Sequence, residues 1–320
     1  MNNEQQTPQA VVFGTGPLGL AVMEELVARG RTVRMVNRRG RVDEALPAGV
    51  SVVAADATDA EQVARVCADT AVVFHCAQPG YTSWPTQFPP ITTGILEGVA
   101  QTNAKLVFGD NLYMYGSTDG QPVHEGLPYA ATGHKGRTRA EMAKQLLAAH
   151  EHGRVQVTIG RASDFYGPRV LGSAVGDIVF AAALAGKTVN VLGRPELPHT
   201  FTYIKDFAWG LVTLSEHDEA YGRAWHVPSA PTISTNDFLK LVEEAVGQPL
   251  KSRAGGKLML TLLGLFVPEM REMKEIFYEF DEPYVVDHTQ FATAFGQNAT
   301  PHKQAIAETV AWYRAHLASK

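Results

Sequence analysis

The sequence predicts an α/β protein with a Rossmann-type, doubly wound parallel sheet. Two patterns indicate this. Short apolar runs alternate with segments of helical periodicity over the first two thirds of the chain. A glycine-rich turn also separates the first apolar run from the first helical segment. A chain of 320 residues is long enough for one two-part domain or for two domains.

The composition bears on which kinds of molecule the protein binds. Hydrophobic residues make up 45% and charged residues 19%, which is ordinary for a folded protein. The net charge of −5 gives no reason to expect nucleic acid or an anionic membrane as a partner. The longest apolar run, residues 258–267, is half the length needed to cross a bilayer, and the polar N-terminus does not resemble a signal peptide. With only Cys67 and Cys76 there is no disulfide framework, so we expect a cytoplasmic protein that acts on a small molecule.

The turn after the first strand has the spacing of a dinucleotide-binding site. Residues 11–13 form a short apolar run that is followed by Gly14, Thr15, Gly16, Pro17, Leu18 and Gly19. In such a turn the first glycine permits the sharp bend, the second lets the backbone approach a pyrophosphate, and the third lets the helix pack close to the strand. The helix N-terminus then offers N–H groups to the anion. A purely structural turn is the alternative, but a second strand at residues 32–36 completes the binding pattern.

The end of the second strand bears on the choice of cofactor. An NAD site places Asp or Glu there to accept from the ribose 2′-hydroxyl, whereas this chain has Asn37, Arg38 and Arg39. Two guanidinium groups suit a 2′-phosphate, so NADP (NADPH) is favoured over NAD. The alternative is that residues 37–41 form a solvated basic turn.

Two further strand ends supply candidate cofactor contacts. Asp56 ends the third strand, where its carboxylate could accept from an adenine amino group or cap the helix that starts near Ala60. Small residues after the fourth strand, within residues 70–80, would let a dinucleotide lie against the backbone. These segments add Asp56, Ala57, Ala77 and Gln78 to the cofactor-binding candidates.

Several motifs in order resemble one known family. After the glycine turn come "ADATD", "VVFHCAQ", "DNLYMYG", "GRASDFYGP" and "HTFTYIKD". Their order and spacing resemble the extended short-chain dehydrogenase/reductases, the group that includes NAD-dependent epimerases and dehydratases. The resemblance implies a Rossmann domain over residues 8–167 with a return segment at 200–227. It also implies a smaller, mostly C-terminal α+β substrate domain from 168–199 and 228–320. Members often pair through two long helices, which here would be residues 86–102 and 134–150 of a homodimer.

The family's catalytic residues do not carry over to this chain. The family has a Ser or Thr four residues before the tyrosine of a "VYG"-like segment, and a Tyr-x-x-x-Lys pair about twenty residues later. Here the Ser/Thr position falls on Asn111, and alignment on Glu141 places the pair on Gly133 and Arg137. A shift of two residues would make Lys135 the lysine but would place alanine at the tyrosine position.

We therefore expect a displaced proton donor. In an extended segment Asn111, Tyr113 and Tyr115 would point to one side, which makes the Tyr113 phenol the leading candidate. Lys135 or Arg137 would lower the pKa of that phenol and hold the nicotinamide ribose, and the Asn111 amide would donate to a carbonyl oxygen. The alternatives are structural: a packed tyrosine, a turn-forming asparagine, and a solvated helix face carrying the basic residues at 135, 137 and 139.

The aromatic and methionine-rich tail at residues 266–287 is the candidate wall of a substrate pocket, with core packing as the alternative. The candidate substrate-binding residues are Tyr81, Tyr166, Tyr278 and Tyr284. No spacing of His, Cys and carboxylate residues indicates a metal site.

Taken with the cofactor features, these residues favour an NADP-dependent oxidoreductase acting on a small carbonyl or alcohol. A sugar-nucleotide epimerase or dehydratase and a non-catalytic NADP-binding regulator are the alternatives.

Overall fold

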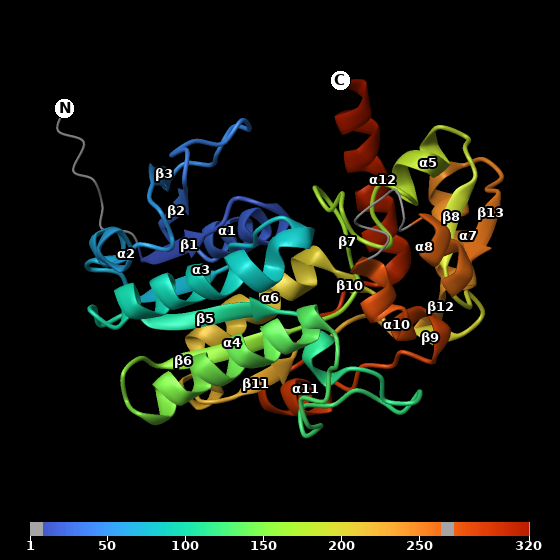
Figure 1. The fold of residues 1–320 in the computed structure, drawn as a ribbon. Helices are drawn as coiled ribbons and strands as arrows, with labels where there is room; N and C mark the ends of the chain where they lie inside the picture. Colours follow the sequence, from blue (N-terminus) through green and yellow to red (C-terminus); the bar gives the residue numbers. More distant parts are fainter. Residues whose placement is uncertain (1–8, 264–271, 320) are drawn as a thin grey trace. The chain divides into compact units, whose positions relative to one another are not determined.

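The computed structural model describes residues 9–263 and 272–319, and the chain divides into two compact units (Figure 1). Unit 1 consists of Met1–Asp110, Thr138–Gly160 and Ala208–Trp225. Unit 2 consists of Asn111–Arg137, Arg161–Phe207 and His226–Lys320.

Unit 1 is built on a seven-stranded sheet with the order β11-β6-β5-β4-β1-β2-β3. The strands are β1 (Ala10–Phe13), β2 (Val33–Asn37), β3 (Val50–Ala54), β4 (Val72–His75), β5 (Lys105–Asp110), β6 (Val157–Arg161) and β11 (Ala224–His226). Strand β1 pairs in parallel with β2 and β4, and all four of its residues are buried, as expected for a sheet covered on both faces. The predicted doubly wound parallel sheet is confirmed. The three-residue β11 was not expected, because so short a run carries no pattern of its own.

Helices cover both faces of this sheet (Figure 1). They are α1 (Pro17–Ala28), α2 (Ala60–Cys67), α3 (Trp84–Val99), α4 (His134–Glu151) and α6 (Ile204–Glu216), with short 3-10 helices η1 (Tyr81–Ser83) and η3 (Asp218–Ala220). A Cβ at Gly109 of β5 would lie 2.7 Å from Leu18 of α1 and 3.2 Å from Leu211 of α6, so these two helices share one face. Helix α3 packs against α2 and accepts a hydrogen bond from Gln145 of α4 at Thr93 (3.0 Å) on the other face.

One expected helix cap proved wrong. Helix α2 does begin at Ala60, but its N-cap is Asp59, whose carboxylate accepts from the N–H groups of Glu61 and Gln62. The carboxylate of Asp56 instead accepts from Thr58 in a tight turn of its own (2.9 Å). Both residues are of the capping type, and only the path of the chain decides between them.

Unit 2 combines short strand pairs with helices. Its strands are β7 (Phe165–Tyr166), β8 (Val189–Leu192), β9 (Pro198–His199), β10 (Thr202–Tyr203), β12 (Ile233–Ser234) and β13 (Ser252–Gly255). Its helices are η2 (Tyr113–Tyr115), α5 (Phe180–Leu184), α7 (Thr235–Val246), α8 (Lys257–Leu263), η4 (Met273–Ile276), α10 (Tyr278–Asp281), α11 (Thr289–Phe295) and α12 (His302–Ala318). The core lies where α5, α7 and α12 pack around Phe180, Phe238 and Tyr313. Unit 2 thus has the mixed α+β character predicted for the second domain.

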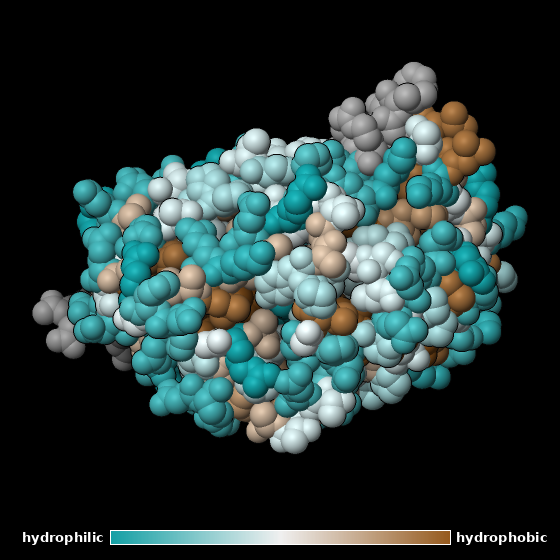
Figure 2. All heavy atoms as spheres, turned by 60° about the horizontal axis from the view of Figure 1, so that its bottom comes forward, coloured by the Kyte–Doolittle hydropathy of each residue, from teal (hydrophilic) through white to brown (hydrophobic). Residues whose placement is uncertain are grey.

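The surface agrees with the composition. The face drawn in Figure 2 is largely hydrophilic, with hydrophobic side chains gathered in small areas. Among residues 9–263 and 272–319, no helix has both the length and the apolar character needed to span a bilayer. The apolar run at 258–267 is described only as far as α8, and its remainder lies outside the described residues, as do positions 266–271 of the aromatic tail. The described residues also contain no cluster of three or more metal-ligating side chains.

Candidate functional site

The glycine turn of unit 1 is shaped for close backbone approach. Gly14 has φ +102°, and a Cβ there would lie 2.7 Å from the carbonyl carbon of Cys76, at the end of β4. A Cβ at Gly19 would collide with the carbonyl oxygen of Gly14. A Cβ at Gly16 would instead meet nothing within 4 Å. Two of the three glycines are therefore required by packing, and the third leaves an open space beside the turn.

That open space lies at the N-terminus of α1. Gly16 is the N-cap residue, and no side chain caps the helix there. Pro17 occupies the first turn, where its missing N–H costs no helical hydrogen bond. A helix N-terminus carries partial positive charge and directs N–H groups outward, so it suits a pyrophosphate.

Asn37 organises the loop after β2. Its side-chain oxygen accepts from the backbone N–H of Arg39 (2.9 Å) and Gly40 (2.7 Å). Its amide nitrogen donates to the Thr15 hydroxyl and the Arg41 carbonyl, both at 2.9 Å. Asn37 therefore ties this loop to the glycine turn. Arg38 and Arg39 are both exposed beside it.

The remaining cofactor candidates also lie at strand ends of unit 1. Asp56 is exposed, and its pKa is lowered mainly by hydrogen bonds from Thr58, with a smaller contribution from the charge of Arg38. Ala77 lies against Gly14, whose added Cβ would be 2.8 Å from the Ala77 nitrogen. The carbonyl of Ala57 would collide with a Cβ at Gly94 of α3, so this residue is held against that helix. Gln78 is exposed, and its side-chain oxygen accepts from Arg139 at 3.4 Å.

The basic residues of α4 differ in their surroundings. Lys135 is fully buried, and its ammonium pairs with Glu272 at 2.5 Å. Arg139 is also buried; it pairs with Asp110 at 3.0 Å and lies over the rings of Trp84 and Phe88. The alternative of a solvated face is therefore wrong for these two residues.

Arg137 is the exposed member of the three. Its guanidinium donates to the Thr132 carbonyl (2.5 Å) and lies 3.1 Å from His134 Nδ1, both close to the start of α4.

The segment after β5 does not have the expected conformation. Tyr113–Tyr115 forms a 3-10 helix, so its side chains do not alternate as they would in an extended segment. Asn111 is buried, and its side-chain oxygen accepts from the backbone N–H of Tyr113 (3.2 Å). Tyr115 is buried with its hydroxyl 2.9 Å from His226, whereas Tyr113 is only half-buried. The period-two interpretation was wrong because a turn after the strand overrides it.

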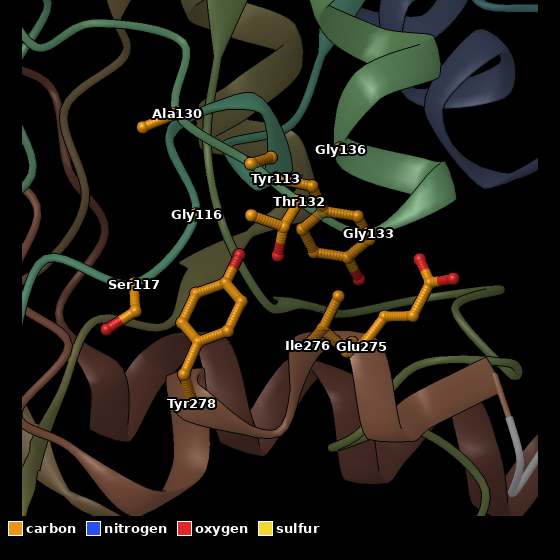
Figure 3. A pocket seen from close by; sticks show the side chains of 11 residues that line it. Tyr113, Gly116, Ser117, Ala130, Thr132, Gly133, Gly136, Glu275, Ile276 and Tyr278 are labelled. Carbon is orange, nitrogen blue, oxygen red and sulfur yellow. The ribbon is translucent and has the colours of Figure 1, made fainter.

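Unit 2 contains a cavity of about 250 Å³ at Tyr113 (Figure 3). Its wall is made by the η2 turn, the start of α4, and the η4–α10 segment. The lining residues are Tyr113, Gly116, Ser117, Ala130, Ala131, Thr132, Gly133, Gly136, Glu275, Ile276 and Tyr278. Among the described residues, the charged residue of the lining is Glu275, and no Lys or Arg belongs to it. A space of this size is at the lower end for ligand sites and fits one ring-sized group.

Polar groups from separate segments line this cavity. In Figure 3 the Tyr113 hydroxyl points toward the side of the cavity that holds Glu275, the Glu275 carboxylate is turned toward the start of α4, and the Tyr278 hydroxyl points toward Thr132. Glu275 also accepts from the backbone N–H of Lys135 in the first turn of α4 (3.0 Å). A Cβ at Gly133 would lie 2.6 Å from an oxygen of that carboxylate. The carboxylate thus fills the side-chain space that a glycine leaves at the start of α4.

The four tyrosines proposed for substrate binding are in different environments. Tyr278 lines the cavity. Tyr166 is fully buried in the core with its hydroxyl on His302 (3.1 Å), and burial raises its pKa. Tyr284 is buried against the ring of His199, and burial raises its pKa as well. Tyr81 lies in unit 1, edge-on to Trp84.

Each unit also holds a fully buried histidine. In unit 1, His75 contacts the Thr92 hydroxyl through Nε2 (3.0 Å), and burial, together with the charge of Arg139, lowers its pKa to about 3. In unit 2, His226 contacts the Tyr115 hydroxyl, and burial, followed by the charge of Arg161, lowers its pKa to about 3. Both imidazoles are neutral at ordinary pH.

Glu275 was not among the residues expected from the sequence. It lies 140 residues from Lys135 along the chain, in a segment whose aromatic and methionine content pointed to packing. The available signal was indirect: a glycine at the start of a helix, at a position where the family resemblance implies a large side chain.

Comparison with known proteins agrees with this architecture. The model of the NAD dependent epimerase/dehydratase family matches residues 10–227. A dTDP-glucose 4,6-dehydratase from Actinoplanes sp. is 26% identical over 204 residues, which are 63% of this chain and 58% of the relative. The bovine sterol-4-alpha-carboxylate 3-dehydrogenase (decarboxylating) is 24% identical over 246 residues, which are 72% of this chain and 68% of the relative. The chain thus spans little more than half the length of the dehydratase.

Solved structures share the fold over nearly the whole chain. A dTDP-glucose 4,6-dehydratase from Streptomyces venezuelae, solved with NAD bound, has a TM-score of 0.79 at 17% identity, covering 97% of this chain and 98% of that one. A UDP-N-acetylglucosamine 4-epimerase from Methanobrevibacter ruminantium gives 0.79 at 17% identity, covering 97% and 99%. Because the family model covers most of unit 1 and about two thirds of the sequence, this chain belongs to the NAD-dependent epimerase/dehydratase family.

Proposed function

We propose that the protein is a nicotinamide-dinucleotide-dependent enzyme that takes hydride from a hydroxyl-bearing carbon of a sugar nucleotide or delivers it to a carbonyl carbon of one. The glycine turn of unit 1 carries this proposal. Gly14 and Gly19 are required for packing, whereas Gly16 leaves the N-terminus of α1 open. An open, uncapped helix N-terminus beside a sharp glycine turn suits a pyrophosphate.

Several residues of unit 1 would hold the dinucleotide. The turn from Gly14 to Gly19 would bind the pyrophosphate, and Asp56 and Ala77 line the neighbouring strand ends. When bound, the nicotinamide supplies an acceptor or donor of hydride. The protein's own task is then to position the substrate and to manage the proton of its hydroxyl group.

The loop after β2 bears on the choice between NAD and NADP. No carboxylate stands there to accept from a ribose 2′-hydroxyl, and the polar groups of Asn37 are engaged within the loop. Exposed Arg38 and Arg39 suit a 2′-phosphate. These residues favour NADP, whereas the family's description and the solved relatives with bound NAD favour NAD.

The cavity of unit 2 suits a neutral, hydroxylated group. Its described lining residues include two phenols and a carboxylate, which can exchange hydrogen bonds with the hydroxyl groups of a sugar ring. Tyr113 would donate a hydrogen bond to the oxygen on which negative charge develops during hydride transfer. The names of the dehydratase and epimerase relatives support the sugar-nucleotide class.

A second candidate is oxidation or reduction of an alcohol or carbonyl compound that carries no nucleotide. The similarity to a sterol dehydrogenase favours it, as does the absence of Lys and Arg from the part of the cavity lining that the structure describes. A cofactor-binding protein without catalysis is a third candidate, because glycine and an exposed arginine stand where the resemblance implies Tyr and Lys.

The first experiment is a fluorescence titration of the purified chain with NADPH and NADH in parallel, repeated for Arg38→Ala. We expect binding of NADPH to weaken about tenfold or more in the variant, since a charge-assisted contact to the 2′-phosphate is lost, while binding of NADH changes little. If the substitution changed the binding of NADPH and NADH equally, Arg38 would not recognise the 2′-phosphate, and NAD would be the assigned cofactor. Binding of neither would refute the proposed function.

Product analysis then separates the candidate functions. The chain is incubated with cofactor and dTDP-glucose, UDP-N-acetylglucosamine, or a panel of small ketones and alcohols, and the products are identified by NMR. Conversion of a sugar nucleotide supports the main proposal, whereas conversion of ketones or alcohols alone supports the second candidate. Cofactor binding without any conversion favours the non-catalytic candidate.

A further inference from the structure

We propose that Glu275 is the proton-transfer residue of the unit 2 cavity, its carboxylate occupying the side-chain space that Gly133 leaves open. This assignment rests on the proposed function and deepens it, because it names the group that takes the substrate's proton.

Oxidation of a substrate alcohol requires a proton acceptor. When a secondary alcohol is oxidised, its C–H hydrogen leaves as hydride to the nicotinamide, and its O–H proton must pass to a base as the carbonyl forms. The proposed function gives Tyr113 the role of hydrogen-bond donor to this oxygen, so we look for a second group that accepts the proton. Among the residues that line the cavity, Glu275 carries the carboxylate.

The Glu275 carboxylate belongs to the same cavity as the Tyr113 hydroxyl. We place the substrate oxygen there, between the two side chains (Figure 3). Oxidation would move the hydroxyl proton to a Glu275 oxygen, and reduction would return it to the carbonyl oxygen. Atoms and charge balance in both directions, with the nicotinamide taking or giving the hydride.

The start of α4 holds the Glu275 carboxylate in place. The backbone N–H of Lys135 donates to it at 3.0 Å, and the N-terminus of α4 favours its negative charge. Gly133 lacks the side chain that would displace it, since a Cβ there would lie 2.6 Å from Oε2 and 3.1 Å from the Glu275 Cβ. The neighbouring ammonium of Lys135 pairs with Glu272.

A purely structural role as a cap of α4 is the competing explanation, and Glu275→Gln separates the two. The amide oxygen can still accept from Lys135, but the side chain no longer takes a proton at neutral pH. We expect kcat to fall at least about 100-fold, the scale of lost general base catalysis, while the melting temperature changes by less than about 2 °C. Asp281→Asn, which changes an exposed carboxylate further along the same segment, should leave kcat as in the native chain.

Gly133→Ala gives a readout that needs no activity. Its Cβ should displace the carboxylate and lower the melting temperature by about 3 °C in the native background. In the Glu275→Ala background, Gly133→Ala should leave the melting temperature almost unchanged, because the colliding side chain is gone. Equal costs in both backgrounds would show that Glu275 does not occupy this space, and the assignment would fall.

The outcomes for activity are equally distinct. A native chain that binds cofactor and converts none of the alcohols, ketones or sugar nucleotides tested refutes the proposed function, and the assignment with it. A native chain that is active while Glu275→Gln matches its kcat refutes the assignment alone. Loss of kcat in Glu275→Gln with stability retained, together with the melting-temperature cycle, supports it.

Discussion

Two helix N-termini in this chain, those of α1 and α4, are both entered through glycine, yet they are completed in different ways. At α1, side chains are excluded by packing at Gly14 and Gly19, and the space beside Gly16 stays open. At α4, the space beside Gly133 is filled by the Glu275 carboxylate, and Glu272 pairs with Lys135 one residue into the helix. The comparison teaches that a helix N-terminus offers an anion site only where the fold leaves its end uncovered.

The largest expected effect is at α1, where packing tolerates no side chain. Gly19→Val would force a branched side chain against the carbonyl oxygen of Gly14, so we expect the free energy of unfolding to fall by about 3 kcal/mol or more. Urea unfolding monitored by circular dichroism would measure this loss.

Gly16→Ser is the matched control at the same turn. Serine suits an N-cap with extended backbone, such as Gly16 with φ −83° and ψ −173°, so stability should stay within about 0.5 kcal/mol. Its hydroxyl would, however, occupy the open space and cap the helix itself, so NADPH should bind more weakly. Undiminished binding would contradict the assignment of this opening to the pyrophosphate.

At α4 the charged partners should matter more than the glycine. Glu272→Ala removes the carboxylate that faces a fully buried ammonium, and we expect a loss of about 3 kcal/mol in the free energy of unfolding. The exposed pair of Arg154 with Glu97 is the comparison: Arg154→Gln should cost less than about 1 kcal/mol. Equal losses would mean that burial of Lys135 does not set the energy of its ion pair.

Acid should weaken both units through their buried histidines. The pKa of His75 and of His226 lies near 3 in the folded chain, against about 6.5 when unfolded. Between these values the unfolded chain binds more protons, so stability is present above pH 6.5 and is lost as the pH falls toward 3. At pH 5 each histidine should contribute a slope of about 1.3 kcal/mol per pH unit.

Single substitutions divide that slope between the units. His75→Leu and His226→Leu should each reduce the dependence of the unfolding free energy on pH, measured by urea titration between pH 4.5 and 5.5. A variant that keeps the full slope would show that its histidine titrates normally in the folded chain.

The sequence was most informative where short-range patterns decide the structure. The glycine turn, the parallel sheet and most helices of unit 1 follow from apolar periodicity and from residues that are close neighbours along the chain. Asp56 shows the limit of this approach, because two carboxylates three residues apart could cap α2 and the local path of the chain selected Asp59. Tyr113 shows another limit, since the turn into η2 replaced the expected alternation.

The cavity of unit 2 depends on contacts that no local pattern encodes. Glu275 meets Gly133 and the first turn of α4 from the far end of the chain, and Tyr278 comes from the segment just after it. The sequence predicts Tyr113 as a proton donor and Tyr278 as a substrate-binding residue, each by itself. That the two share a cavity follows only from tertiary packing.

The two cysteines provide a natural reporter on one part of the molecule. Burial raises the pKa of the Cys67 thiol to about 12, and desolvation raises the pKa of the half-buried Cys76 thiol well above its usual range, so both thiols should react slowly in the folded chain. Both belong to unit 1, and Cys76 lies directly against Gly14. The rate at which a thiol reagent labels Cys76 should therefore report on the surroundings of the glycine turn, with no background from unit 2. A bound dinucleotide should slow that labelling, which makes the native chain its own sensor of occupancy.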